Sequence, residues 1–206
     1  MPTENQEPSA TADTVIASNV NTTKPKQVYH GKSNNLFALS IMNPWAQFIV
    51  DGLKPVENRS WHLKLTGVLL IHASSTFHTE WRDCLSSQAL KVANRYVSMK
   101  TISLKGASPW TSSAVIGAAI VTHCDDLYNS IWCQQGYAYI WLHSPIKFSN
   151  PIPCSGKMKI FHPDIDIQQF SYQDKKALLN LYDTSKMLGL QKLDISDFRM
   201  SQPSTE

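Results

Sequence analysis

Three ionic side chains stand close together in residues 52–61, GLKPVENRSW, and their types suit the binding of a nucleotide. Arg59 has a planar guanidinium that can hold a phosphate or a base edge at two points, and Lys54 has a compact positive charge. In an extended chain every second side chain shares a face, so Glu57, Arg59 and Trp61 point the same way. The segment therefore predicts a ligand-facing strand that mixes charge with an indole ring.

A simpler interpretation of the same residues is a salt bridge on the strand surface. Glu57 would pair there with Lys54 or Arg59, and an exposed pair of this kind contributes less than about 1 kcal/mol. If the cluster is catalytic, Glu57 acts as a base or positions a water molecule. The catalytic residues stay unassigned at this stage, and Lys54 and Glu57 are candidates only if the protein is an enzyme.

A short helix is predicted immediately before this cluster. Asn43 is a suitable N-cap, Pro44 fits the first helical position, and Gly52 can adopt the left-handed conformation that ends a helix. Apolar residues between them recur at i, i+3 and i+4, which is the pattern of a helix packed on a core. These residues are Trp45, Phe48 and Ile49. The helix is expected to be a buried support for the charged strand.

Gly52, Lys54, Glu57 and Arg59 are spaced as G-x-K-x-x-E-x-R, and with this signature the chain resembles the ASCH domain family. That family has a small β-barrel similar to the PUA domains of RNA-modifying proteins. Further segments resemble its strands and first helix in the same order, and they are LSIMNPWA, GVLLIHAS, AVIGAAIV, YAYIWL and NPIPCSGKMKIF. The resemblance covers about residues 37–162. It implies a mainly β fold with flanking helices, built on a small PUA-like β-barrel.

Hydrophobic patterns along the rest of the chain agree with this fold class. Short apolar or alternating runs predict strands at residues 37–41, 56–61, 68–73, 114–121, 137–142 and 158–161. An amphipathic helix is predicted over residues 77–97, and a loop with Gly, Pro and Ser over residues 100–113. The apolar stripe of that helix is Trp81, Leu85, Val92 and Tyr96. A last helix is predicted from a capping box at Ser171 and Asp174 to Gly189.

The resemblance implies a protein that binds RNA or a nucleotide, because relatives in this family are widely inferred to bind RNA. The residues expected to contact the ligand are Lys54, Glu57, Arg59, Trp61, His72 and Ser74. Without the resemblance, a histidine such as His72 in an apolar strand is more often a hydrogen-bonded core residue. Other aromatic side chains supply either stacking platforms for bases or ordinary packing. They are Tyr137, Tyr139, Trp141 and Trp110, of which Trp110 is expected to be exposed.

Three other functions stay open. Some small bacterial members of the family act as amidohydrolases on acylated cytidine, but they carry Thr as the nucleophile at the position of Glu57. If this chain is an enzyme, we expect a hydrolase on nucleosides or RNA, acting in that way or by metal-assisted cleavage with Glu57 helping to hold the ion. The last alternative is a module that binds only protein, through the barrel and its C-terminal helix.

No cofactor and no resident metal are expected. His72 and His78 flank two serines, but no third group that would orient a catalytic pair is identifiable from the spacing. Residues 123–126 contain metal-ligand types, yet successive residues on a strand point to opposite faces and do not converge. The four cysteines show no C-x-x-C spacing, which argues against a zinc knuckle or a redox pair.

Length and composition indicate one domain with two tails, since 206 residues with 42% hydrophobic content can bury one sizeable core. Residues 1–35 are predicted to be a disordered tail, residues 36–163 the barrel domain, and residues 164–206 a helical appendage with a tail. The net charge of +3 permits a polyanionic partner without requiring one. No signal peptide and no membrane span are expected, so we predict a cytoplasmic protein.

Overall fold

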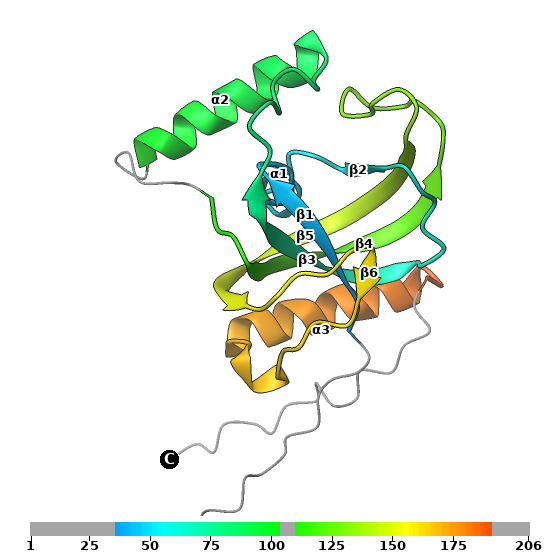
Figure 1. The fold of residues 1–206 in the computed structure, drawn as a ribbon. Coiled ribbons are helices and arrows are strands. Elements are labelled where there is room, and N and C mark those ends of the chain that lie inside the picture. The colour runs from blue at the N-terminus through cyan, green and yellow to red at the C-terminus, as the bar shows by residue number, and fades with distance from the viewer. Residues whose placement is uncertain (1–35, 104–109, 191–206) are drawn as a thin grey trace, which may run out of the picture. The chain divides into compact units, whose positions relative to one another are not determined.

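The computed structural model of the protein describes residues 36–103 and 110–190, which belong to one compact unit. Within them, six strands form one sheet in the order β2-β5-β4-β3-β1-β6 (Figure 1). The strands are β1 (Ala38–Asn43), β2 (Val56–Arg59), β3 (Gly67–Phe77), β4 (Ala114–Asp125), β5 (Ala138–Pro153) and β6 (Ile160–Phe161). The helices are α1 (Trp45–Val50), α2 (Ser87–Ser103), the 3-10 helix η1 (Ile167–Gln169) and α3 (Tyr172–Met187).

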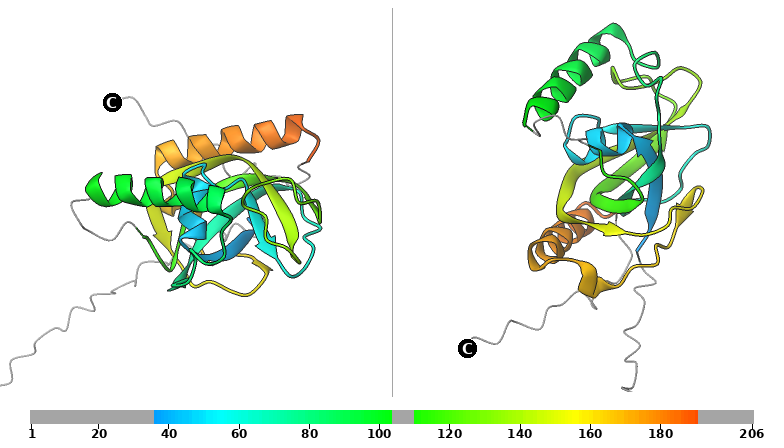
Figure 2. Two further views of the ribbon diagram at one scale, coloured as in Figure 1. Left: turned by 90° about the horizontal axis from the view of Figure 1, so that it is seen from above. Right: turned by 60° about the vertical axis from the view of Figure 1, so that its left-hand side comes forward.

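The sheet is mixed and strongly curled. β1 and β3 are parallel, whereas every other neighbouring pair is antiparallel. The pairing of β4 with β5 shifts register at three places, and such bulges bend and twist a strand pair. Both long strands accordingly curve around the core as a half-barrel (Figure 2). The predicted class, a mainly β fold with flanking helices, is confirmed, and its six strands form one curled sheet.

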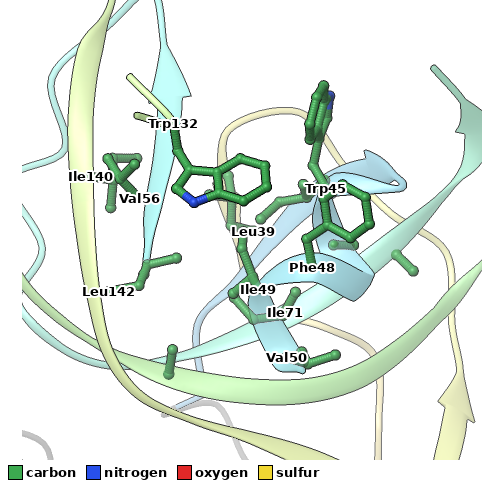
Figure 3. Packing of buried hydrophobic residues seen from close by; sticks show 14 of the residues in the cluster. Leu39, Trp45, Phe48, Ile49, Val50, Val56, Ile71, Trp132, Ile140 and Leu142 are labelled. Atoms are coloured by element: carbon green, nitrogen blue, oxygen red, sulfur yellow. The ribbon is translucent and has the colours of Figure 1, made fainter. Parts of the chain in front are cut away.

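The central strands are buried on both faces, which explains their nearly continuous apolar sequences. On β3, Leu69 and Ile71 belong to one hydrophobic cluster, while Val68 and Leu70 belong to another on the opposite face. The first cluster includes α1, and Figure 3 shows side chains of α1 packed against those of the surrounding strands and Trp132. The second cluster includes α3, so helices cover the sheet from both sides (Figure 1).

Helix α1 is the buried support that the sequence predicts, because all six of its residues are buried. Gly52 ends it with φ +77°, as expected for a left-handed residue after a helix. The prediction that Asn43 is the N-cap is wrong. Asn43 is the last residue of β1, its side chain donates a hydrogen bond to the carbonyl oxygen of Thr111, and Pro44 occupies the cap position without a side-chain hydrogen bond.

The helix predicted over residues 77–97 starts ten residues too early. β3 continues to Phe77, and α2 begins only at Ser87 and extends into the predicted loop to Ser103. Trp81 is buried before the helix starts, where its ring meets those of α1 edge-on. The buried face of α2 is made by small residues, and Val92 of the predicted stripe is 41% exposed. These small residues are Ala89 and Ala93.

The last predicted helix is present and lies on the sheet. Ser171 caps α3 by accepting a hydrogen bond from the backbone N–H of Asp174, as predicted. The carboxylate of Asp174 also accepts hydrogen bonds from the backbone N–H and the hydroxyl of Ser149 on β5, both at 2.8 Å. Leu178 and Leu181 are buried in the second cluster. The C-terminal helix is therefore a docked part of the fold. The predicted tail at residues 1–35 and the end of the predicted appendage, residues 191–206, lie outside the described residues.

No helix within residues 36–103 and 110–190 is long and apolar enough to cross a membrane.

Candidate functional site

The three ionic side chains predicted to contact the ligand converge beside the edge strand β2. The ammonium nitrogen of Lys54 lies 3.0 Å from Oε2 of Glu57, and Nε of Arg59 lies 3.2 Å from Oε1 of the same carboxylate. Lys54 is only 3% exposed and Glu57 only 5% exposed. The salt bridge therefore exists, but its placement on the strand surface is wrong, because Lys54 and Glu57 are buried.

Backbone carbonyl groups hold the two cations in place. Lys54 donates to the carbonyl oxygen of Val56 as well as to Glu57, and its ammonium nitrogen lies 5.7 Å from the ring centroid of Trp45. Arg59 donates from Nη2 to the carbonyl oxygen of Ser40 at 2.8 Å. A quarter of the Arg59 side chain remains exposed. Two cations around one carboxylate leave one net positive charge when all three groups are ionised.

Burial changes the protonation of the lysine. Burial lowers the pKa of Lys54, the Glu57 carboxylate opposes this shift, and the nearby Arg59 adds to it. The net result is a pKa of Lys54 below the ordinary value for lysine. The Lys54 ammonium therefore loses its proton more readily than an exposed lysine does. Lysines that act in catalysis share this property, and so do other buried lysines.

Two adjoining hollows surround these residues. The first, which we call the charged pocket, has a volume of about 320 Å³ and is lined by Lys54, Glu57, Arg59, Trp61, Ser74 and Tyr137, among others. The second, which we call the serine-rich pocket, has a volume of about 670 Å³ and is lined by Ser40, Arg59, His72, Ser113, Lys157 and Lys159, among others. Both pockets share four lining residues, which are Ser40, Arg59, Trp61 and Ser74. The six residues predicted to contact a ligand thus line these two adjoining hollows.

His72 lies in the wall of the serine-rich pocket with both ring nitrogens engaged. Nδ1 lies 3.0 Å from the hydroxyl of Ser40, and Nε2 lies 3.0 Å from the carbonyl oxygen of Cys154. Because a carbonyl only accepts, Nε2 carries the proton, and in the neutral ring Nδ1 accepts from Ser40. Burial lowers the pKa of His72. The residue is therefore the hydrogen-bonded core histidine that its apolar strand indicates, and it also borders a pocket.

The aromatic candidates separate clearly by burial. Tyr137 is 42% exposed and lines the charged pocket beside Trp61. Tyr139 is buried in the core, and the indole N–H of Trp141 donates to Asp125. Trp110, which was expected to be exposed, is half-buried and belongs to the apolar contacts of the first cluster. Tyr137 and Trp61 are therefore the aromatic side chains of this set that can meet a ligand in the charged pocket.

Several lining residues were not singled out from the sequence. Ser40 reaches the site because β1 and β3 are parallel in a register that pairs it with His72. Lys157 and Lys159 come from the segment between β5 and β6, and their only sequence signal was the family-like run NPIPCSGKMKIF. Cys84 lies in the charged pocket beside His78, with Nε2 of the ring 4.0 Å from the sulfur.

Potential metal ligands do not gather in the described part of the chain. Within residues 36–103 and 110–190, no group of three or more His, Cys, Asp and Glu side chains is placed to hold an ion. Asp125 and Asp126 face different partners, since Asp126 lies 3.0 Å from His62 and Asp125 lies 3.3 Å from His123. The four cysteines have free thiols.

Comparisons with known proteins agree with the signature at this site. The family model of the ASCH domain matches residues 39–151, more than half of the chain, and the protein belongs to the ASCH domain family. The crystal structure of ASCH from Zymomonas mobilis is similar at 12% identity with a TM-score of 0.39, over 72% of this chain and 96% of that one. A structure of the same bacterial protein with one tyrosine replaced by phenylalanine is similar at 13% identity and the same TM-score, over 71% and 98% of the two chains. A comparison with curated proteins found no match.

Proposed function

We propose that the protein binds RNA or a nucleotide in the charged pocket. The observation that carries the proposal is the convergence of Lys54, Glu57 and Arg59 in one hollow that two aromatic side chains also line. These aromatic side chains are Trp61 and Tyr137. A net positive charge suits a phosphate, and an aromatic ring at the rim suits a base. Membership in the ASCH family supports the same conclusion.

Arg59 is the residue best prepared to contact the ligand. Its guanidinium is held from one side by the Ser40 carbonyl and from the other by Glu57, while a quarter of the side chain is exposed. The remaining N–H donors of the fork are therefore already oriented, and less side-chain entropy is lost when a phosphate or base edge binds. Lys54 and Glu57 are more deeply buried, so their main contribution is to fix Arg59 and the charge of the pocket.

The arrangement favours binding over catalysis by Glu57. Both oxygens of this carboxylate already face cations, Oε2 toward Lys54 and Oε1 toward Arg59. A carboxylate whose two oxygens both face cations has no oxygen free to take a proton from a ligand, so it is a poor general base. One observation does favour a second candidate function, an amidohydrolase-like activity on a modified nucleoside, and it is the lowered pKa of Lys54.

Fluorescence anisotropy with a labelled single-stranded RNA tests the binding function. The wild-type protein should bind at low salt, and Arg59→Gln should weaken binding about tenfold while reducing the slope of log K against log salt by about 0.7, as for one lost phosphate contact. Arg95→Gln is the matched control, because Arg95 is exposed on α2 and does not line either pocket. A thermal melt of each variant checks that the fold is intact.

Two results would reject the binding function. The first is that neither RNA nor single-stranded DNA binds the wild-type protein at low salt. The second is that Arg59→Gln leaves both the affinity and the salt slope unchanged. Incubation with acetylated cytidine tests the second candidate separately, since release of acetate that is lost in Lys54→Met would establish the hydrolase. RNA that stays intact with added manganese would remove metal-assisted cleavage.

A further inference from the structure

The serine-rich pocket adjoins the charged pocket. The two hollows meet at four shared lining residues, which are Ser40, Arg59, Trp61 and Ser74. The charged pocket has about 320 Å³, and the serine-rich pocket has about twice that volume, 670 Å³. A ligand that fills only the charged pocket leaves the serine-rich pocket filled with solvent. A longer ligand extends past Arg59, where the two pockets meet, into the serine-rich pocket.

Of the described cations that line the two pockets, those without a carboxylate partner, Lys157 and Lys159, lie in the serine-rich pocket. Its lining includes Arg59, Lys157 and Lys159, together with five serines, and it includes no Asp or Glu among the residues that the structure describes. Within that part of the chain, neither lysine forms an ion pair. In the charged pocket, by contrast, Glu57 offsets one of the two cations. The larger hollow is therefore the stronger attractor for an anion with several charges.

The segment that carries the two lysines is held against the wall by close contacts. A Cβ atom on Gly156 would lie 2.6 Å from Cε1 of His72 and 2.7 Å from Oγ of Ser40, so only glycine allows this approach. His72 also donates a hydrogen bond to the carbonyl oxygen of Cys154 in the same segment. Lys159 has φ +59°, a conformation that a residue with a side chain keeps only when its surroundings impose it. The backbone that presents the lysines is thus built into the pocket.

On the basis of the proposed function, we infer that the ligand is a single-stranded oligonucleotide that spans both pockets. The base and sugar of one nucleotide occupy the charged pocket next to Trp61 and Tyr137, and the phosphate of that nucleotide lies at Arg59, where the two pockets meet. The following phosphates lie against Lys157 and Lys159 in the serine-rich pocket. A mononucleotide makes the contacts in the charged pocket and at Arg59 but does not reach Lys157 and Lys159. Affinity therefore depends on the length of the strand and not on the base alone.

Competition binding with ligands of increasing length tests this inference. The probes are uridine monophosphate and oligouridylates of two, four and eight nucleotides, measured against the labelled RNA at low salt. Wild-type affinity should rise at least about tenfold from the mononucleotide to the four-nucleotide strand. Deoxy-oligonucleotides of the same lengths supply the same phosphates. Comparing their affinities with those of the oligouridylates shows whether the site distinguishes DNA from RNA.

A double substitution separates the two pockets. Lys157→Gln with Lys159→Gln should weaken binding of the four-nucleotide strand about tenfold and reduce the salt slope by about 1.4, while the mononucleotide affinity stays within about twofold of the wild type. Lys176→Gln with Lys186→Gln removes the same charge from exposed positions on α3 and should change neither affinity. All four lysines are exposed, so both double variants should keep the wild-type melting temperature.

The outcomes distinguish this inference from the proposed function. If the mononucleotide binds in an Arg59-dependent way but longer strands bind no better, the spanning ligand is wrong and the charged pocket remains a binding site. If the double variant weakens mononucleotide and oligonucleotide equally, the two lysines act only through net charge, and the inference is again wrong. If nothing binds, both proposals fail together.

Discussion

Replacing Glu57 with Gln tests the buried charge cluster most directly. The change keeps the size of the side chain but removes the one negative charge between Lys54 and Arg59, at 3.0 and 3.2 Å. Removing one partner of a buried ion pair costs about 3–5 kcal/mol, because the other charge stays buried without compensation. Arg59 is a quarter exposed and can be solvated, so only the Lys54 pair counts in full, and we expect a loss near the lower limit, about 3 kcal/mol.

Urea denaturation followed by tryptophan fluorescence measures this loss. With a slope of roughly 2 kcal/mol per molar, a change of about 3 kcal/mol moves the midpoint by about 1.5 M. Asp126→Asn is the matched control, since Asp126 pairs with His62 at the surface and its side chain is 68% exposed. That substitution should cost less than about 1 kcal/mol. A midpoint for Glu57→Gln as close to the wild type as that of the control would refute the reasoning.

Two further readouts make the same test specific to electrostatics. Without the carboxylate, burial and Arg59 lower the pKa of Lys54 further below its unfolded value of 10.5. The unfolded chain then binds the proton more strongly, so the deficit of Glu57→Gln should shrink as pH rises toward that value. Adding Lys54→Met removes the second charge as well, and the double variant should recover stability relative to Glu57→Gln. A double variant less stable than Glu57→Gln would contradict the account even if the single variant folds poorly.

Two other substitutions test the packing of the sheet at Gly117 and the protonation of His72. Gly117→Ala should lower the free energy of unfolding by about 3 kcal/mol in urea, because a Cβ there would overlap the carbonyl oxygen of Ile146 and approach Val50 Cγ1 to 2.7 Å. His72→Gln should flatten the pH dependence of stability below the unfolded pKa of 6.5. Burial lowers the pKa of His72, so the unfolded wild type takes up the proton first and stability is lost as pH falls from 6.5 toward the folded pKa.

Matched controls and contrary results are available for both. Gly136→Ala meets nothing within 4 Å, so it costs only the backbone strain at φ +82°, about 1 kcal/mol. An equal cost for the two glycine variants would show that the close approach at Gly117 is not tight. His143→Gln changes an exposed histidine and should leave the pH profile unchanged. A profile for His72→Gln that keeps the wild-type slope below pH 6.5 would show that the buried ring does not titrate as described.

Local patterns in the sequence predicted most of the elements correctly. The alternation in residues 56–59, the apolar run of β3 and the cap at Ser171 all depend on neighbours within a few positions, and the structure contains each of them. The errors occur where distant contacts override a local pattern. Asn43 gives its side chain to the carbonyl of Thr111 instead of capping α1, and Trp81 is buried among the rings of α1 before α2 begins.

The amino-acid order was enough to place Glu57 and Arg59 on one strand, with Lys54 just before it, and to identify the ASCH family, because spacing and signature are properties of contiguous residues. Burial of the ion pairs is not such a property. It arises when β2 pairs with β5 at the edge of a curled sheet, beside α1. The hydrogen bond between Ser40 and His72, 32 positions apart, and the approach of Lys157 and Lys159 to Arg59 likewise depend on strand pairing across the chain. Which distant strands become neighbours is decided by the packing of the whole sheet, and the spacing within one segment does not determine it.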